Sequence, residues 1–111
     1  MITKAAEFST GLNQLANLAK ALSHPARIQI LKTVAKRKEC FCGEIVEVLP
    51  LAQSTVSQHL RELKAAGLIK GETEGLRSCY CIDWKAVRKF RDLSAKFFLE
   101  LERHEQAGQC C

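Results

Sequence analysis

The sequence predicts a mainly α (α+β) fold, a winged helix-turn-helix with four to five helices and a β-hairpin wing. Three observations predict it: apolar residues recur at helical spacing, a helix with a polar outer face follows a tight turn, and a hairpin comes directly after that helix. With 111 residues, the chain has the size of one domain. We expect a single domain over 1–111, with an ordered core over about 8–105 and a mobile, cysteine-containing tail over 106–111.

Two helices are expected in the first third of the chain. Leucines at 3–4 spacing predict an amphipathic helix over 5–22. A second helix follows, because Ser23 can cap it and Pro25 suits a first helical turn. This helix runs through the apolar residues Ile28, Ile30, Leu31 and Val34.

The next two helices would form the helix-turn-helix. A short helix is expected from about residue 42 or 43 to 49, where Pro50 ends it. After the turn, Ser54 is expected to cap a helix that runs through Ala66 and ends at Gly67. The buried stripe of that helix lies at i, i+4 and i+7, namely Val56, Leu60 and Leu63.

A hairpin and a long helix complete the chain. Strands are expected over 68–70 and 77–82, with a glycine-rich tip over 71–75 between them. Side chains alternate along the second strand, so Cys79 and Cys81 lie on one face. Tyr80 and Ile82 lie on the other face, toward the core.

Asp83 is expected to cap the last helix, which runs to about Glu105. Its apolar stripe consists of Val87, Phe90, Leu93, Phe97 and Leu101, with Phe98 beside it. This is more apolar surface than one thin monomer can cover. The sequence therefore predicts a homodimer through the first and last helices.

The chain is basic. It has 17 Lys and Arg against 12 Asp and Glu, a net charge of +5 and a pI near 9.0, which favours an anionic partner, nucleic acid first. The longest uncharged run, 48–60, is too short and too polar to cross a bilayer, and the N-terminus has no apolar signal segment. We expect a cytoplasmic protein with no membrane partner.

The helix that begins near residue 54 has the features of a DNA-reading helix. A helix fits the major groove of double-stranded DNA, where its N-terminal residues reach base edges. Gln58 can pair with adenine through two hydrogen bonds, whereas Arg77 on the wing is placed to contact phosphates. The full set of predicted DNA contacts is Gln53, Ser54, Thr55, Ser57, Gln58, His59, Arg61 and Arg77.

The six cysteines form three close pairs: Cys40/Cys42, Cys79/Cys81 and Cys110/Cys111. In a reducing compartment, clustered thiols indicate metal binding or redox sensing more often than disulfide scaffolding. Two residues at i and i+2 point about 200° apart on a helix but lie on one side of an extended segment. Cys40 and Cys42 can therefore bind one ion only where their segment is extended or unwinds.

Three segments carry a family resemblance: ALSHPARIQIL (21–31), QSTVSQHLRELKAAGLI (53–69) and YCID (80–83). Over roughly residues 8–105, the chain resembles the ArsR/SmtB family of metal-sensing repressors. The resemblance implies a homodimer, built on the first and last helices, that binds an operator with inverted-repeat symmetry and releases it when an effector binds.

A further resemblance concerns the thiols. Glu39-Cys40-Phe41-Cys42-Gly43-Glu44-Ile45 is similar to the Glu-x-Cys-x-Cys-Asp-Leu motif of the family's arsenic, cadmium and lead sensors, although Gly43 replaces the Asp. It implies that Cys40 and Cys42 are the core of a thiolate site. The third sulfur stays open among Cys110, Cys111, Cys79 and Cys81. No permanent cofactor is expected; the regulatory ion would be soft, with arsenite or antimonite favoured and cadmium or lead next.

Two other functions remain open. The cysteine pairs could be oxidised rather than bind metal, in a redox- or persulfide-sensing repressor. Alternatively, Cys40, Cys42, Cys79 and Cys81 could hold a structural zinc ion in a DNA-binding protein. An enzyme is not expected, since no catalytic triad, carboxylate pair or phosphate-binding loop is visible in the sequence.

Overall fold

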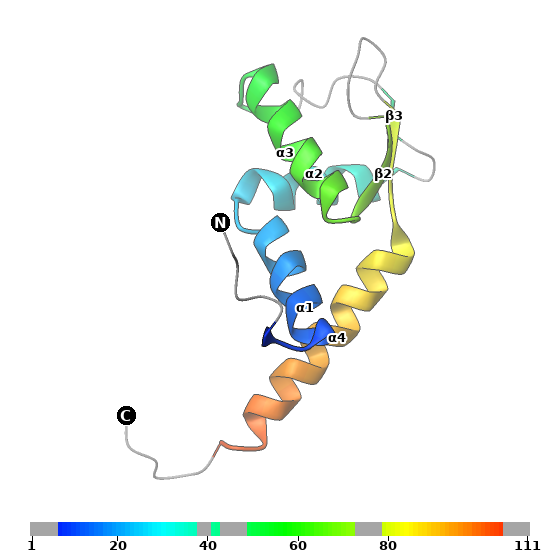
Figure 1. Ribbon diagram of the computed structural model, residues 1–111. Coiled ribbons are helices and arrows are strands. Elements are labelled where there is room, and N and C mark those ends of the chain that lie inside the picture. The colour runs from blue at the N-terminus through cyan, green and yellow to red at the C-terminus, as the bar shows by residue number, and fades with distance from the viewer. Residues whose placement is uncertain (1–6, 38–40, 43–48, 73–78, 106–111) are drawn as a thin grey trace.

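The computed structural model describes residues 7–37, 41–42, 49–72 and 79–105. That part of the chain contains four helices and a three-stranded sheet, which confirms the predicted winged helix-turn-helix class (Figure 1). The elements, in order, are α1 (Thr10–Ala21), α2 (Pro25–Ala35), β1 (Phe41–Cys42), α3 (Gln53–Ala65), β2 (Ile69–Glu72), β3 (Cys79–Ile82) and α4 (Trp84–Glu102). None of these helices is both long and apolar enough to cross a membrane.

Polar side chains cap the starts of α1 and α4. The Oγ of Ser9 accepts a hydrogen bond from the backbone N–H of Leu12 at 3.2 Å, so the helix expected over 5–22 begins only at Thr10. The Oδ1 of Asp83 accepts one from the backbone N–H three residues later, also at 3.2 Å. The predicted cap of the last helix is thus confirmed.

The predicted caps of the other two helices are wrong. At α2, the ring of His24 takes the role assigned to Ser23, since its Nδ1 accepts the backbone N–H of Ala26 at 3.0 Å. At α3, the extended N-cap residue is Ala52, with no side-chain hydrogen bond, and Ser54 lies inside the first turn. Because that turn has no side-chain cap, its first N–H groups are left to water or to an anion such as a DNA phosphate.

Gly67 ends α3 as predicted. It adopts φ +85°, a left-handed conformation that costs glycine little. The N–H of Leu68 donates to the carbonyl oxygen of Leu63 at 3.1 Å, and the N–H of Gly67 donates to the carbonyl oxygen of Lys64 at 2.9 Å. This pair of bonds is a Schellman motif, and it turns the chain directly from α3 into β2.

The wing is larger than the predicted hairpin, because a third strand joins it. The strand order is β1-β3-β2 and both pairings are antiparallel. In the first, Phe41 pairs with Tyr80 and Cys42 with Cys79. Residues 71 and 72, expected in the tip, belong to β2, and 73–78 lie outside the described residues.

The helix expected from about residue 42 to 49 does not begin at Cys42. That residue is in β1, because its backbone pairs with β3 of the wing. Residues 43–48, on which the rest of that prediction falls, lie outside the described part of the chain. Leu49 is buried in the core.

The core lies where α2, α3 and the sheet meet. Its most completely buried large side chains are Tyr80, Ile30, Leu63, Leu68 and Ile69. The predicted stripe of α3 is confirmed, because Val56, Leu60 and Leu63 are all buried. On α2, Ile30 and Val34 are buried and Leu31 is partly buried, whereas Ile28 is 46% exposed.

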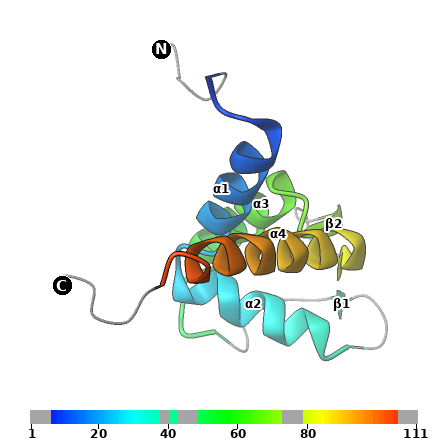
Figure 2. The ribbon, with the colours of Figure 1, turned by 90° about the horizontal axis from the view of Figure 1, so that it is seen from below.

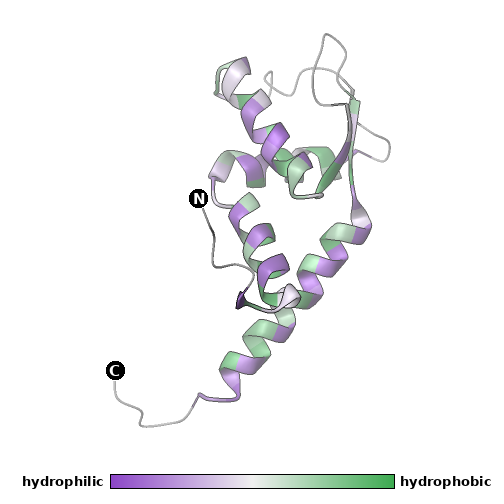
Figure 3. Cartoon of the chain, viewed as in Figure 1, coloured by the Kyte–Doolittle hydropathy of each residue, from purple (hydrophilic) through white to green (hydrophobic). Residues whose placement is uncertain are grey.

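The two halves of α4 have different surroundings. Seen from below, α4 crosses the body with α1 on one side and α2 on the other (Figure 2). Its first half packs Ala86, Val87, Phe90 and Leu93 against the core. Its second half runs past the body and still carries apolar residues (Figure 3). Of these, Phe97, Phe98, Leu99 and Leu101 are exposed.

Gly71 gives a test of the sheet. It has φ +113°, and a Cβ there would collide with the carbonyl oxygen of Cys79 on β3. Gly71→Ala should lower the free energy of unfolding by about 1–3 kcal/mol from backbone strain alone, with the collision adding to this. Gly11→Ala in α1 is the matched control, because its Cβ meets nothing within 4 Å. Urea unfolding at one protein concentration measures both; equal stability of the two variants would contradict this sheet geometry.

Candidate nucleic-acid interface and thiol face

The helix α3 lies beside the strands of the wing (Figure 1), and the side chains of its polar face are exposed. Five of the predicted DNA contacts on this helix are exposed, and Ser57 is half-buried. The exposed five are Gln53, Ser54, Thr55, Gln58 and Arg61. The structure therefore brings these side chains together on one accessible helix face. Arg77, the predicted wing contact, lies outside the described residues.

Gln58 is held by its own helix when no DNA is bound. The Nη2 of Arg61 donates to the Gln58 amide oxygen at 2.8 Å, and the Gln58 amide nitrogen donates to Glu62 Oε1 at 3.1 Å. Both halves of the amide are thus already oriented along the exposed face. A base that pairs with this amide would exchange these solvent-exposed hydrogen bonds for its own.

His59 does not face DNA or solvent, so its predicted place among the DNA contacts is wrong. Only 6% of its surface is exposed. The reason is helical period: residue 59 lies three positions after Val56 and four before Leu63, on the same face as both. This i, i+3, i+7 spacing was the signal in the sequence that could have shown the burial.

A polar cluster anchors this buried side of α3. The Nε of Arg27 donates to His59 Nδ1 at 3.1 Å, and the ring of His24 lies 4.4 Å from that of His59 between centroids. Arg27 also donates through Nη1 to the carbonyl oxygen of Lys20 at 3.3 Å. It therefore ties the end of α1 and the start of α2 to α3. Sequence reasoning missed Arg27, although it lies in the 21–31 segment.

The environment of His59 disfavours its charged form. Burial is the main cause that lowers the pKa of His59 below the ordinary value of 6.5, and the charges of His24 and Arg27 add to it. A neutral ring is required for Nδ1 to accept the Arg27 hydrogen bond. His59 therefore positions α3 as a neutral acceptor.

The wing cysteines share one face of β3, as predicted. Tyr80 and Ile82 are buried, whereas Cys79 and Cys81 are half-buried on the other face, and both cysteines are disulfide-bonded. Cys42 lies at the end of β1, next to β3. Since Cys42 is in a strand, the expected unwinding of a first helical turn at this residue does not apply.

The other predicted thiol ligands are not placed. Cys40, Cys110 and Cys111 lie outside the described residues. Within the described part of the chain, no group of three or more His, Cys, Asp or Glu side chains is arranged to hold a metal ion. The thiolate site therefore stays a prediction.

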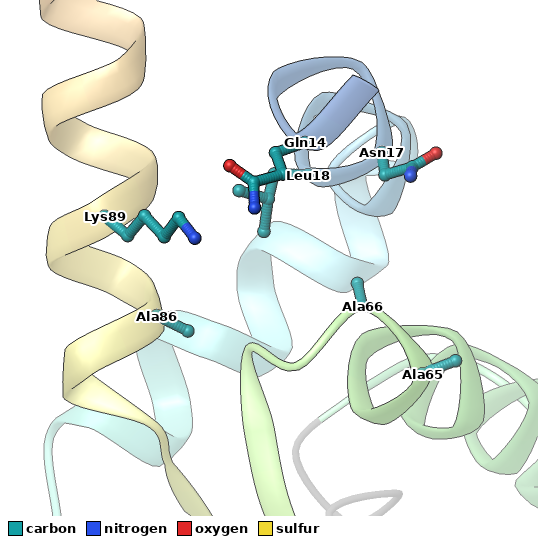
Figure 4. A pocket seen from close by; sticks show the side chains of 7 residues that line it. All are labelled: Gln14, Asn17, Leu18, Ala65, Ala66, Ala86 and Lys89. Atoms are coloured by element: carbon teal, nitrogen blue, oxygen red, sulfur yellow. The ribbon is translucent and has the colours of Figure 1, made fainter. Parts of the chain in front are cut away.

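A pocket separates the C-terminal end of α3 from α1 and α4. It has a volume of about 270 Å³ (Figure 4). The residues that line it are Gln14, Asn17, Leu18, Ala65, Ala66, Ala86 and Lys89. In the figure, the Lys89 side chain extends from α4 toward Gln14 on α1. The end of the helix that carries the exposed polar face thus lies beside both long helices.

Comparison with known proteins assigns the chain to a family. The family model described as "Bacterial regulatory protein, arsR family" matches residues 24–70. The HTH-type transcriptional regulator YgaV of Escherichia coli (strain K12) is 34% identical over 86 residues, which cover 78% of this chain and 87% of that protein. The chain belongs to the ArsR family.

Two further similarities bear on this ArsR-family chain. The arsenical resistance operon repressor of Bacillus subtilis (strain 168) is 32% identical over 93 residues, covering 83% of this chain and 85% of that repressor. A solution structure of a homodimeric winged helix-turn-helix DNA-binding domain from Mycobacterium bovis is 28% identical, with a TM-score of 0.55, over 96% of this chain and 95% of that domain. The ArsR-family chain is thus a DNA-binding transcriptional regulator and not an enzyme.

His59 predicts how the stability of the protein depends on pH. Unfolded His59 takes up a proton near pH 6.5, whereas folded His59 does so only at lower pH, so the unfolded chain binds more protons between these values. The free energy of unfolding should therefore fall as the pH drops below about 6.5. Urea unfolding between pH 8 and 5 measures it. His59→Gln should flatten this dependence, and His104→Gln, at an exposed site, should not; identical pH profiles for the parent and His59→Gln would contradict the assignment.

Proposed function

We propose that the chain is a homodimeric repressor that binds double-stranded operator DNA of inverted-repeat symmetry and releases it when a soft metal or metalloid ion binds cysteine thiolates. The observation that carries the DNA-binding part is the exposed polar face of α3, presented beside a wing in an ArsR-family chain. The chain holds no permanent cofactor in this proposal. The ion is a regulatory ligand.

The helix α3 has what a major-groove reader needs. Its exposed residues include an amide and hydroxyls for base edges, and Arg61 for phosphate. Its buried side is fixed by the Arg27–His59 hydrogen bond, so the exposed face is held in one orientation. A rigid support of this kind limits the ordering that binding requires.

The dimer would form through α1 and α4. Phe98 is 57% exposed and Phe97 40% exposed on the free half of α4, and Leu12 on α1 is 56% exposed. A pocket between these helices is lined by Leu12, Leu15, Leu93 and Phe97, among others. Large exposed apolar side chains of this density mark an interface. A two-fold dimer presents two copies of α3, which explains the inverted repeat.

The effector part rests on the cysteines. Cys40 and Cys42 are proposed to bind the ion, with a third sulfur from Cys79 or Cys81 on the wing or from Cys110 or Cys111 on the tail. The extended backbone at Cys42 supports this, since neighbours at i and i+2 share a side only in an extended segment. Thiolates favour soft ions, so arsenite or antimonite comes first and cadmium or lead next.

Redox sensing is the second candidate, and one observation favours it. Cys79 and Cys81 are disulfide-bonded in the structure, so oxidation of thiols is compatible with the folded wing. In this alternative, an oxidant or a persulfide would change the state of the cysteines, and no ion would bind.

The first test concerns base reading. Gln58→Ala should weaken specific operator binding by about 1–3 kcal/mol, because one bidentate base contact is lost. Arg77→Ala should weaken binding to all DNA and reduce its salt dependence. Gln29→Ala, an exposed glutamine on α2, is the matched control and should bind like the parent. Operator affinity at several salt concentrations measures these effects; parent-like binding by both variants would refute the placement of helix and wing.

The second test concerns the dimer. Phe97→Glu should give monomers or unfolded chain, because a charge would be buried in the apolar interface. Arg88→Glu is the control: it lies nine residues earlier, about 180° around α4, and is also exposed. Sedimentation of both variants measures the oligomeric state. A folded, dimeric Phe97→Glu would show that the interface lies elsewhere.

The third test concerns the effector. Cys40→Ser and Cys42→Ser should each bind operator like the parent but lose release by the ion. Operator binding by the reduced proteins, titrated in parallel with arsenite, cadmium, lead, zinc and peroxide, measures this. Typical allosteric coupling is about 1–3 kcal/mol, and two sites at about 3 kcal/mol each would reach the roughly 5.5 kcal/mol of a near-complete switch. If the ion releases operator from Cys42→Ser at the same concentration as from the parent, this site is rejected. If only peroxide releases operator, the redox candidate is selected.

A further inference from the structure

An apolar pocket lies on the α2 side of α4, where these two helices meet the base of the wing (Figure 2). It has a volume of about 270 Å³, and its wall is entirely apolar. The wall includes Leu31 and Ala35 of α2, Ile82 of β3, and Val87 and Phe90 of α4. An apolar cavity of about 150 Å³ is already large enough to bind benzene. This pocket therefore has room for a small organic molecule.

The pocket is separate from the surface proposed for the dimer. None of its lining residues lines the pocket between α1 and the second half of α4. Exposed apolar side chains border it: Trp84, at the start of α4, is 50% exposed, and Ile28, three positions before Leu31 on α2, is 46% exposed. A concave apolar site with large exposed apolar side chains at its edge is typical of ligand binding.

The charge around the pocket is positive on both helices. Every charged residue over 25–37, which includes α2, and over 84–91, the first half of α4, is Lys or Arg, four in each stretch. The two acidic residues that flank the second stretch are engaged elsewhere. Asp83 caps α4, and Asp92 forms an ion pair with Arg91 at 3.0 Å. A negatively charged ligand is therefore favoured here over a positively charged one.

Lys32 lies at the edge of the pocket. Of the described residues that line it, Lys32 is the one that carries a charge. Because the wall is entirely apolar, its methylene stem forms part of the wall and its ammonium group lies outside, in water. No carboxylate among the described residues pairs with it. Lys36 and Arg88 follow the lining residues Lys32 and Trp84 by four positions, one turn along the same helix faces.

We propose that this pocket binds a small amphipathic anion, with an alkyl chain or ring inside the pocket and one carboxylate beside Lys32. The apolar body supplies affinity, because its burial removes both it and the wall from water. The carboxylate supplies selectivity for anions. A nucleic acid, whose backbone is charged throughout, would gain little from an apolar wall. The inference goes beyond the proposed function, since it needs neither the cysteines nor DNA.

Trp84 is a built-in reporter for the experiment, because it lines the pocket and is the only tryptophan of the chain. Octanoate is titrated into the full-length chain, and octan-1-ol, with the same chain length and no charge, is the matched probe. Octanoate should shift the emission of Trp84 to shorter wavelength in a saturable way, since its alkyl chain displaces water from the indole ring. Added salt should weaken the binding of octanoate but not that of octan-1-ol.

Charge variants test the selectivity for anions. Lys32→Glu should weaken octanoate binding by about 3- to 30-fold, because an attraction between exposed charges becomes a repulsion of similar size, and should leave octan-1-ol binding unchanged. Lys89→Glu is the matched control. It makes the same charge change on α4, but the Lys89 side chain extends toward Gln14 on the α1 side (Figure 4). This variant should bind both probes like the parent.

A filling variant tests the place of the ligand. Ala35 lines the pocket from an exposed position at the end of α2, so a larger side chain there removes no core contact. Ala35→Phe should abolish the binding of both probes, because its ring occupies the space that the alkyl chain needs. Circular dichroism of each variant checks that the chain is folded.

Four outcomes would overturn the inference. If octanoate causes no saturable shift of Trp84 emission in the parent, the pocket does not bind such an anion. If Lys32→Glu binds octanoate like the parent, or loses both probes equally, there is no selectivity for anions at this edge. If folded Ala35→Phe binds like the parent, the ligand lies elsewhere. If the shift appears only after dilution to monomers, a second copy of the chain covers the pocket.

Discussion

The central strand β3 is the element on which the rest of the structure depends. Tyr80 and Ile82 fill the core from one of its faces, and both of its edges are paired, with β1 on one side and β2 on the other. Burial raises the pKa of Tyr80 to about 12, so its phenol stays neutral. The N–H of Asp83 bonds to the carbonyl of Leu68 at 2.9 Å, and the Asp83 side chain then caps α4. One short strand thus connects the wing, the end of α3 and the start of the long helix.

A second constraint fixes the direction in which α3 presents its polar face. Val56, Leu60 and Leu63 provide apolar burial, which is not directional. The Arg27–His59 hydrogen bond and the adjacent His24 ring add direction, and His24 caps α2 at the same time. A buried imidazole that must stay neutral to accept this bond ties the placement of the helix to pH. A histidine on the exposed polar face of α3 would not need to stay neutral to hold the helix in place.

The two halves of the long helix α4 have different surroundings. Its first half, through Leu93, packs against the core, and its second half, from Phe97, leaves large apolar side chains exposed. Because one helix spans both, a dimer interface on its second half, as proposed, would be joined directly to the half that packs against the core. The pocket between α1, α4 and the end of α3 lies on this route.

Much of the fold could be read from local sequence patterns, because these patterns report interactions between near neighbours. The 3–4 spacing of leucines, the buried stripe of α3, the Gly67 stop and the Asp83 cap all depend on residues within a few positions of each other. The exposed set from Gln53 to Arg61 followed from the same periodicity. Family membership also rests on sequence.

Only the tertiary structure decided where distant segments meet. Nothing near Cys42 in the sequence indicated that it pairs with Cys79, because a strand of two residues has no period of its own and is stabilised by its partner strand. Arg27 and His59 are 32 positions apart, and their hydrogen bond exists only because α2 and α3 pack together. Likewise, His24 rather than Ser23 caps α2, and the same ring lies against that of His59 on α3. Local sequence determined the elements, whereas the contacts between them, which control the charge state of His59 and the place of Cys42, required the folded chain.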